Sequence, residues 1–182
     1  MGPRSILSYN TDAMATTIVS VEQYLHTSYQ DGDREYVDGR IVRRNVGEVD
    51  HSDVQTLLAV YLRAQYPAAW TGVEVRVQVS PTRFRIPDVT VVLGSKPVEQ
   101  IISTPPALVV EVHSPDDRAA DVQEKIEDYL SFGIPCCWVI NPRTRRAYIH
   151  DGQGGREATD GRLTTAHGEI EMPLAKLFDS TL

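Results

Sequence analysis

The stretch PALVVEVHSPDDRAADVQEKIEDYLSFGIPCCWVINP, residues 106–142, decides the fold. Two apolar runs of strand length, at 107–113 and 136–140, enclose a segment whose apolar residues recur with helical spacing. The predicted buried stripe of that helix consists of Val122, Ile126 and Leu130. A strand, a helix and a second strand in this order predict a right-handed βαβ unit.

The ends of this predicted helix carry recognisable signals. Ser114 can cap the first turn, Pro115 suits the first helical position, and the two aspartates that follow favour the positive end of the helix dipole. Gly133 is placed to end the helix, because glycine adopts the left-handed conformation at little cost. We therefore predict a helix that starts directly after the first strand.

Shorter elements precede and follow this unit. Ser20 opens a capping-box pattern before a short helix. The dipeptide Asp38-Gly39 lies between two alternating segments, which is a strong signal for a two-residue hairpin. An amphipathic helix follows and is stopped by Pro67. Hairpin strands within 146–173 and a short helix complete the sequence.

Alternation of apolar and polar residues predicts two further strands. One covers residues 72–81, and the other covers residues 84–94 and is entered through Pro87. The residues of the first strand predicted to point inward are Val73, Val75, Val77 and Val79. The order helix, hairpin, helix, strands, helix, strand, hairpin predicts an α/β or α+β fold with helices against a sheet.

Length and composition are those of one globular domain. The 182 residues can bury a sizeable core, and the hydrophobic fraction of 41% is ordinary. We expect a flexible N-terminal tail at residues 1–15 and a single domain over residues 16–182. No apolar run approaches the roughly 18 residues of a membrane span, so we expect no membrane partner.

The cysteines and the net charge narrow the function classes. Cys136 and Cys137 are adjacent, and neighbours on a strand point to opposite faces, so a bridge between them is unfavourable. Buried, reduced thiols predict a cytoplasmic protein. The formal charge of −7 argues against a general nucleic-acid binder, although Arg40, Arg43 and Arg44 form a local basic cluster.

Two acids occupy the predicted strands. Alternation puts Asp88 on the same face as Thr90, and Glu111 on the same face as His113. If the two strands are neighbours, Asp88 and Glu111 converge at one end of the sheet. A buried carboxylate is costly unless it is paired or binds a metal, and two of them suit a hard divalent cation, Mg²⁺ or Mn²⁺.

Hydrolytic chemistry at such a site also needs a cation or a base near the attacking water. His113 and Lys125 are the candidates. Both have a structural alternative: Lys125 can pair with Asp121 one turn earlier on the helix, and His113 can be a hydrogen-bonded residue at a strand end.

The motifs, taken together, resemble a known family. REYVDGRIV at 34–42, His51 at the start of a helix, RIPDVTVV at 85–92 and the stretch at 106–142 occur in the order found in the Uma-type family of restriction-endonuclease-like proteins. That family was long classed as a domain of unknown function and belongs to the PD-(D/E)XK nuclease-like superfamily. The resemblance covers nearly the whole chain.

The resemblance implies a restriction-endonuclease-like core, with a mixed sheet between helices and an added N-terminal hairpin. It implies that Asp88 and Glu111 bind the metal, Mg²⁺ or Mn²⁺, that the Val112 main-chain carbonyl adds a ligand, and that Glu35 completes the shell. His51 stands where the family often places a histidine. The alternatives are a hairpin-surface carboxylate for Glu35 and a solvent-facing helix residue for His51.

One position departs from the superfamily pattern. The pattern has a lysine two residues after the second acid, and this chain has His113 there. Lys125 matches the helix lysine of the family, and its long side chain can bring an ammonium back to the same site. By resemblance, the catalytic residues are therefore expected to include Lys125.

The activity that the resemblance implies is metal-dependent endonucleolytic hydrolysis of phosphodiester bonds in DNA, and a homodimer would allow both strands to be cut. Two alternatives stay open. An inactive relative would bind nucleic acid or a partner protein through the same scaffold. A purely structural domain would turn Asp88 and Glu111 apart or pair them with arginines.

Overall fold

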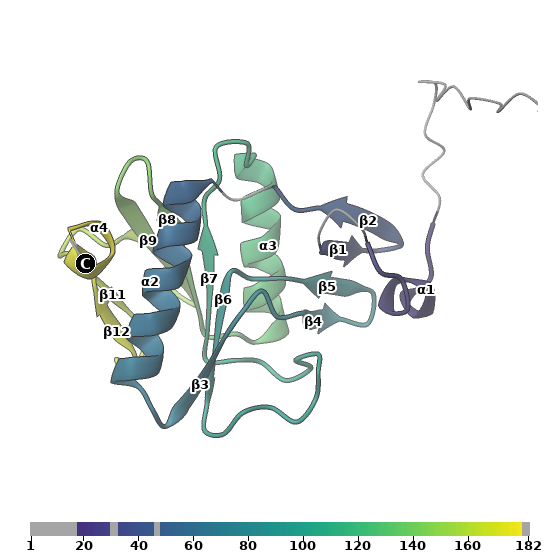
Figure 1. Cartoon of the computed structure of the whole chain (residues 1–182), viewed down its shortest axis with the longest axis horizontal. Coiled ribbons are helices and arrows are strands. Elements are labelled where there is room, and N and C mark those ends of the chain that lie inside the picture. The colour runs from purple at the N-terminus through teal and green to yellow at the C-terminus, as the bar shows by residue number, and fades with distance from the viewer. Residues whose placement is uncertain (1–17, 30–32, 46–47, 180–182) are drawn as a thin grey trace, which may run out of the picture.

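The computed structural model describes residues 18–29, 33–45 and 48–179. The tail predicted at residues 1–15 lies outside the described residues. Figure 1 shows a large sheet with the helices α2 and α3 running alongside its strands, and a smaller sheet to one side. The short helix α1 lies beside the small sheet, at the end away from the large sheet. The site described below lies where the two sheets meet.

The large sheet has six strands in the order β10-β9-β8-β7-β6-β3. Its strands are β3 Ala69–Val73, β6 Val89–Leu93, β7 Leu108–Val112, β8 Cys136–Asn141, β9 Arg146–Asp151 and β10 Gly154–Glu157. β7 and β8 are parallel, and the other neighbouring strands are antiparallel. The helix α3, Ala119–Phe132, joins the two parallel strands, so the predicted strand–helix–strand unit is present.

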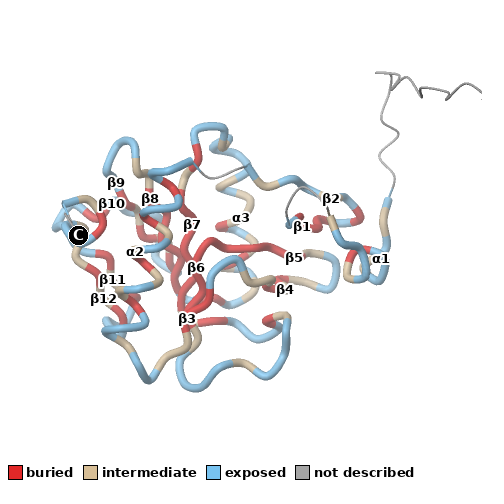
Figure 2. The backbone as a smooth tube through the Cα atoms, viewed as in Figure 1, coloured by how far each residue is buried: buried red, intermediate tan, exposed pale blue. Residues whose placement is uncertain are grey.

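Helices cover both faces of this sheet. Val110 and Val112 of β7 pack in the cluster that contains α2, Val49–Gln65, whereas Val109 packs in the cluster that contains α3. The predicted stripe of α3 is confirmed, since Ile126 is buried and its two partners pack against the same cluster. Figure 2 shows the result, with the central strands buried and the outer sides of the helices exposed.

The smaller sheet has four antiparallel strands in the order β2-β1-β5-β4. They are β1 Arg34–Val37, β2 Arg40–Arg43, β4 Val77–Ser80 and β5 Arg83–Arg85. The predicted hairpin between β1 and β2 is confirmed. Asp38 and Gly39 both adopt the left-handed conformation, with φ of 48° and 89°, which a tight two-residue turn requires.

An aromatic cluster attaches the first helix to this sheet. Ser20 makes the predicted capping box and starts α1, Val21–Leu25. Tyr24 of α1 is fully buried and stacks on Tyr36 at a centroid distance of 5.1 Å, with Phe84 at 5.4 Å. Such pairs add to the free energy of burial, so the small sheet has its own core.

The strand predicted over residues 72–81 is broken. β3 ends in the large sheet at Val73, and β4 begins in the small sheet at Val77. Glu74 between them has a φ of 52°, in the left-handed region, so the extended strand does not continue through it. Val73, predicted to point inward, is the last residue of β3, just before this break, and it is 49% exposed.

The strand predicted over residues 84–94 divides in the same way. β5 ends at Arg85 and β6 begins at Val89, and Pro87 between them has no N–H to donate to a strand ladder. The two crossings lie side by side, because the Glu74 N–H donates to the Asp88 main-chain oxygen at 3.2 Å. Asp88 therefore stands at the junction of the two sheets.

The start of α3 differs from the sequence prediction. α3 begins at Ala119, with Arg118 at the N-cap position and no side-chain cap. Residues 113–118 form a loop in which Asp117 Oδ2 accepts the Ser114 N–H at 2.7 Å. The predicted cap at Ser114 is wrong because Arg118 has an extended backbone, with φ of −86° and ψ of 135°, so the helix starts only after it. Gly133, with a φ of 99°, ends the helix as predicted.

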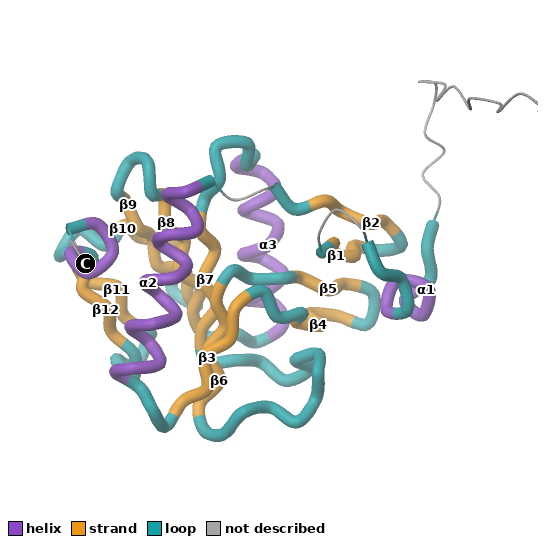
Figure 3. The backbone as a smooth tube through the Cα atoms, in the orientation of Figure 1, coloured by secondary structure: helices purple, strands orange, loops and turns teal. Residues whose placement is uncertain are grey.

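The closing elements pack beside α2. They are β11 Arg162–Thr164, β12 Glu171–Pro173 and the short helix α4 Ala175–Phe178. Figure 3 shows them at the side of the large sheet away from the small one. Cys136 and Cys137 are buried free thiols, as predicted. In the described parts of the chain, no helix has the length and apolar character needed to cross a membrane.

Candidate active site

A cavity of about 930 Å³ lies at the junction of the two sheets. Its walls come from the hairpin of β1 and β2, the residues between β5 and β6, the end of β7 and the first half of α3. The predicted site residues that line it are Glu35, His51, Asp88, Glu111, Val112 and Lys125. Segments far apart in the sequence therefore deliver these side chains to one place.

The two central acids come from neighbouring strands. β6 and β7 pair antiparallel with Val89 opposite Val110, and one further step in this register sets Asp88 opposite Glu111. Residues directly opposite each other present their side chains on the same face of a sheet. The structure thus brings Asp88 and Glu111 together rather than turning them apart.

Glu111 lies in a central strand with its carboxylate toward α3. Oε1 accepts a hydrogen bond from the Tyr129 hydroxyl at 2.5 Å, and Oε2 accepts one from Lys125 Nζ at 3.0 Å. Lys125 and Tyr129 are one helical turn apart, so one face of α3 supplies both partners. A charged side chain is tolerated inside the sheet because both of its oxygens are paired.

Glu35 reaches the same place from the small sheet. Its Oε1 accepts the Ile86 N–H at 3.2 Å and lies 3.1 Å from Lys125 Nζ, and its Oε2 accepts a hydrogen bond from Arg85 at 3.0 Å. Glu35 is 1% exposed, so it is not a carboxylate of the hairpin surface. The Lys125 ammonium therefore bridges Glu35 and Glu111, one acid from each sheet.

The charges of this cluster are unequally compensated. Burial raises the pKa of Glu111, Lys125 opposes this, and Asp88 and Glu35 help to bring the pKa to about 7. Burial alone would lower the pKa of the Lys125 ammonium, but the two acids beside it raise that pKa. For Glu35, Lys125 and Arg85 together outweigh burial and lower the pKa. Glu111 is thus the acid whose negative charge is least stabilised.

Asp88 is held on both carboxylate oxygens. Oδ2 accepts the Val112 N–H at 2.7 Å and lies 3.4 Å from His51 Nε2, and Oδ1 accepts a hydrogen bond from Arg44 at 2.8 Å. Burial raises the pKa of Asp88, but His51, Arg44 and the Val112 N–H outweigh it and lower the pKa. His51 is buried against this acid and does not face solvent.

His113 contacts a different partner. Its Nδ1 lies 3.7 Å from Asp117 Oδ2, in the loop that precedes α3. The other oxygen of Asp117 accepts a hydrogen bond from the Asn45 amide at 2.7 Å. The position that carries a lysine in the superfamily pattern is therefore engaged with this loop, and the ammonium between Glu35 and Glu111 comes from Lys125 on the helix.

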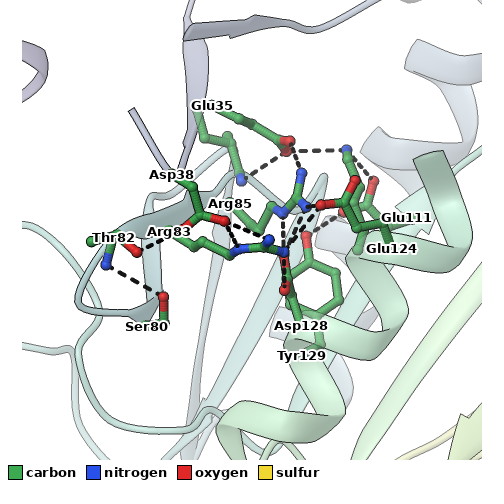
Figure 4. A network of polar contacts seen from close by, with 12 residues as sticks. Glu35, Asp38, Ser80, Thr82, Arg83, Arg85, Glu111, Glu124, Asp128 and Tyr129 are labelled. Carbon is green, nitrogen blue, oxygen red and sulfur yellow. Dashed lines mark hydrogen bonds and ion pairs between the residues drawn. The ribbon is translucent and has the colours of Figure 1, made fainter. Parts of the chain in front are cut away.

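A network of charges anchors α3 to the small sheet (Figure 4). Arg85 is 4% exposed in its side chain and contacts Asp128 at 2.7 Å and Glu124 at 3.3 Å besides Glu35. Arg83 contacts the same two helix acids at 2.9 and 3.0 Å. Because Lys125 lies on this helix face, the network fixes the distance from its ammonium to the acids of the sheets.

Three functional neighbours were not identified from the sequence: Arg44, Arg85 and Tyr129. The spacing of four residues between Lys125 and Tyr129 placed both on one helix face and could have indicated Tyr129. Arg44 and Arg85 each have another arginine within two residues in the sequence, a pattern that indicates local positive charge and nothing about a buried partner. Their partners lie 30 or more residues away in sequence, and no local pattern reveals such pairs.

The donor chemistry can be compared with the needs of a metal. Three carboxylates and the main-chain oxygen of Val112 offer the hard oxygen ligands that Mg²⁺ prefers. Throughout residues 18–29, 33–45 and 48–179, however, no three acidic, histidine or cysteine side chains already surround one point as metal ligands do. Cationic side chains occupy the carboxylate oxygens instead, so a metal would have to displace them.

The chain is similar to known proteins in sequence and in fold. The model of the Uma2 family, described as "Putative restriction endonuclease", matches residues 21–175. A crystal structure from Anabaena variabilis, described as "a putative nuclease belonging to DUF820", is similar with a TM-score of 0.77 and 18% sequence identity. The match covers 88% of this chain and 98% of that one, and at this identity it shows the fold. Among curated proteins, none matches. The predicted family resemblance and fold class are confirmed.

Proposed function

The chain belongs to the Uma2 family, and from that premise we propose that it is a nuclease, a metal-dependent endonuclease that hydrolyses phosphodiester bonds in DNA. One observation carries the proposal. Glu35, Asp88 and Glu111 line a single cavity with Lys125, whose ammonium lies 3.0 Å from Glu111 and 3.1 Å from Glu35.

The chemistry of the donor set supports a hard divalent cation, Mg²⁺ or Mn²⁺. Asp88 and Glu111 would hold it, with Glu35 and the main-chain oxygen of Val112 as further ligands. In a strand, the N–H and the C=O of one residue point to the same side, and the Val112 N–H points to Asp88. The raised pKa of Glu111 also reflects negative charge that a cation would neutralise.

The metal would neutralise charge on the phosphoryl oxygens and lower the pKa of a water molecule. The residues of the chain do the rest. Lys125 places a positive charge beside the acids, where it can orient the attacking water and stabilise the negative charge that develops. Tyr129 fixes Glu111 Oε1, and the Val112 N–H and His51 fix Asp88 Oδ2, so both carboxylates are oriented in advance.

A second candidate function is supported by a specific observation. The acids are already paired with cations of the protein, and His113 stands in place of the superfamily lysine. An inactive relative that binds nucleic acid or a partner protein would keep these pairs permanently. The two candidates differ in one respect, which is whether DNA is hydrolysed at the cavity when a divalent cation is present.

The deciding experiment incubates the purified protein with supercoiled plasmid in Mg²⁺, in Mn²⁺ and in EDTA. We expect nicking or linearisation with at least one metal and none in EDTA. Asp88→Ala and Glu111→Ala should lower the rate by roughly 10²-fold or more. The matched control is Glu99→Ala, which removes an exposed carboxylate outside the cavity.

The outcomes separate the candidates. Equal cleavage by the parent and by both site variants would assign the activity to a contaminant. An intact plasmid with either metal, together with DNA binding by the parent, would favour the binding module. A homodimer would allow both strands to be cut in one encounter, so we also propose that two copies assemble on DNA, and sedimentation of the protein with and without a short duplex measures it.

A further inference from the structure

The cavity contains an arginine that no sequence motif singles out. Arg44 follows β2, and its side chain lines the cavity with 17% exposure. One nitrogen, Nη2, donates to Asp88 Oδ1 at 2.8 Å, and the other, Nη1, lies 3.3 Å from Glu74 Oε1. The guanidinium therefore lies between the buried acid of the site and the open side of the molecule.

Two other cations that line the cavity are committed to structural partners. Arg85 binds Glu35, Glu124 and Asp128 and is 4% exposed in its side chain. Lys125 bridges Glu35 and Glu111. Removal of either cation from its position would leave buried carboxylates uncompensated, which is costly.

Arg44 is under less constraint. The Glu74 side chain is 47% exposed, and an ion pair at such a site contributes little to stability. Asp88 would also remain held without Arg44, since its second oxygen accepts the Val112 N–H and lies near His51. Loss of Arg44 would leave Asp88 Oδ1 without this partner, but the divalent cation of the proposed function, which Asp88 would hold, would compensate the carboxylate in its place. The guanidinium can therefore leave Glu74 at little cost, and it can leave Asp88 when that cation is bound.

We propose that Arg44 binds the substrate phosphate: its guanidinium exchanges Glu74 and Asp88 for the non-bridging oxygens of the phosphodiester that is cut. This inference rests on the proposed nuclease function. The planar fork of arginine matches two phosphate oxygens, which a lysine ammonium cannot do. In a cavity with seven acidic lining residues, such a cation also offsets the repulsion of a polyanion.

The test measures DNA binding and cleavage separately. Affinity for a short duplex is followed by fluorescence anisotropy in Ca²⁺ at several salt concentrations, with a denaturing gel to show that the duplex stays intact. Affinity falls with salt, and loss of one phosphate contact should reduce the magnitude of the slope of log affinity against log salt by about 0.9. We expect this change for Arg44→Gln, together with a fall of roughly 10²-fold in single-turnover cleavage.

Two further variants separate binding from structure. Arg44→Lys keeps the charge and loses the fork, so it should retain the salt slope and lose part of the cleavage rate. Arg146→Gln removes an exposed arginine of β9 that pairs with Glu157, outside the cavity, and should change neither quantity. Thermal unfolding of each variant shows whether the fold is retained.

The outcomes distinguish this inference from the function on which it rests. If the parent cuts DNA and Arg44→Gln keeps the parental slope and rate, Arg44 is a structural partner of Asp88 and the inference is wrong. If Arg44→Gln does not fold, Arg44→Lys decides by the same comparison of cleavage rate. A parent that neither binds nor cuts DNA would overturn the proposed function, and the inference with it.

Discussion

Tyr129 donates its phenolic hydrogen to Glu111 Oε1 at 2.5 Å, although the two residues lie on different elements and 18 positions apart. Tyr129 is fully buried, and burial together with Glu111 raises the pKa of its hydroxyl. The hydroxyl therefore stays protonated at neutral pH and can only donate to the carboxylate. This contact makes Tyr129 a positioning residue for Glu111 and leads to the first prediction.

Tyr129→Phe should lower the free energy of unfolding by about 1.5–3 kcal/mol, because it leaves a buried carboxylate oxygen without its donor. Urea unfolding measures this difference. Tyr148→Phe, at a half-buried position of β9, is the matched control and should stay within about 0.5 kcal/mol of the parent. Equal effects of the two changes would mean that the hydrogen bond to Glu111 contributes little.

Lys125→Met tests the bridge between the two sheets. It removes the ammonium shared by Glu35 and Glu111, so two buried acids lose a cation, and the expected cost is about 3–5 kcal/mol. Guanidinium unfolding measures it, with Lys96→Met at an exposed position as the control. Lys125→Arg should recover part of the stability. A cost for Lys125→Met no larger than that of the control would contradict the bridging role.

The environment of Asp151 predicts that the free energy of unfolding depends on pH in the acidic range. Burial raises the pKa of its carboxyl, but hydrogen bonds from Arg156 and the Gln153 N–H outweigh this and lower the pKa below its ordinary value of 3.8. A group whose pKa is lower in the folded state stabilises the fold above its unfolded pKa and loses that effect as the pH falls through its folded pKa.

Asp151→Asn should therefore cost about 1–2 kcal/mol near neutral pH, and the gap to the parent should narrow as the pH falls below the ordinary value of 3.8 and close once it passes the lower folded pKa. Unfolding curves at several pH values measure the gap. Asp160→Asn, at an exposed turn, is the matched control and is measured at the same pH values. A gap that stays constant down to low pH would rule out the ionised form of Asp151 as the source of the stability.

The two adjacent cysteines should react slowly with thiol reagents in the folded protein. Burial raises the pKa of Cys136 to about 12, and burial also raises the pKa of Cys137. Because the thiolate is the reactive form, a thiol reagent near neutral pH should modify neither cysteine in the folded protein and both after denaturation. Rapid labelling of the native protein would show that this part of the sheet opens easily.

Local signals made much of the fold predictable. The capping box at Ser20, the turn at Asp38-Gly39 and the helix end at Gly133 each depend on a few neighbouring residues, and the structure confirms all three. The break at Glu74 was not predictable, because alternation continues through it and the change of sheet is decided by distant strands. The cap predicted at Ser114 is wrong because the chain is extended at Arg118, four residues later, and α3 starts only after it.

The site depended on a different kind of information. Alternation predicts that Asp88 and Glu111 converge if their strands are neighbours, and the need for a cation near the attacking water makes Lys125 a candidate. Glu35 and His51 follow from the family resemblance alone. Their contacts bridge separate elements, and only the packing of α3 on both sheets brings Lys125 to Glu35 and Glu111. The sequence shows Arg44 only as part of a basic cluster, because no neighbouring residue indicates that its partner is the buried Asp88, 44 positions later.

The double crossing between the sheets has a consequence for insertions and deletions. Glu35 belongs to one sheet and Glu111 to the other, and three residues, 86–88, carry the chain from β5 to β6 between them. One residue added there would exchange inward and outward positions in one sheet relative to the other. The hairpin tip at Gly152-Gln153, between β9 and β10, is exposed and should accept extra residues far more easily. Length variation among working members of such a fold should therefore be rare at 86–88 and common at hairpin tips.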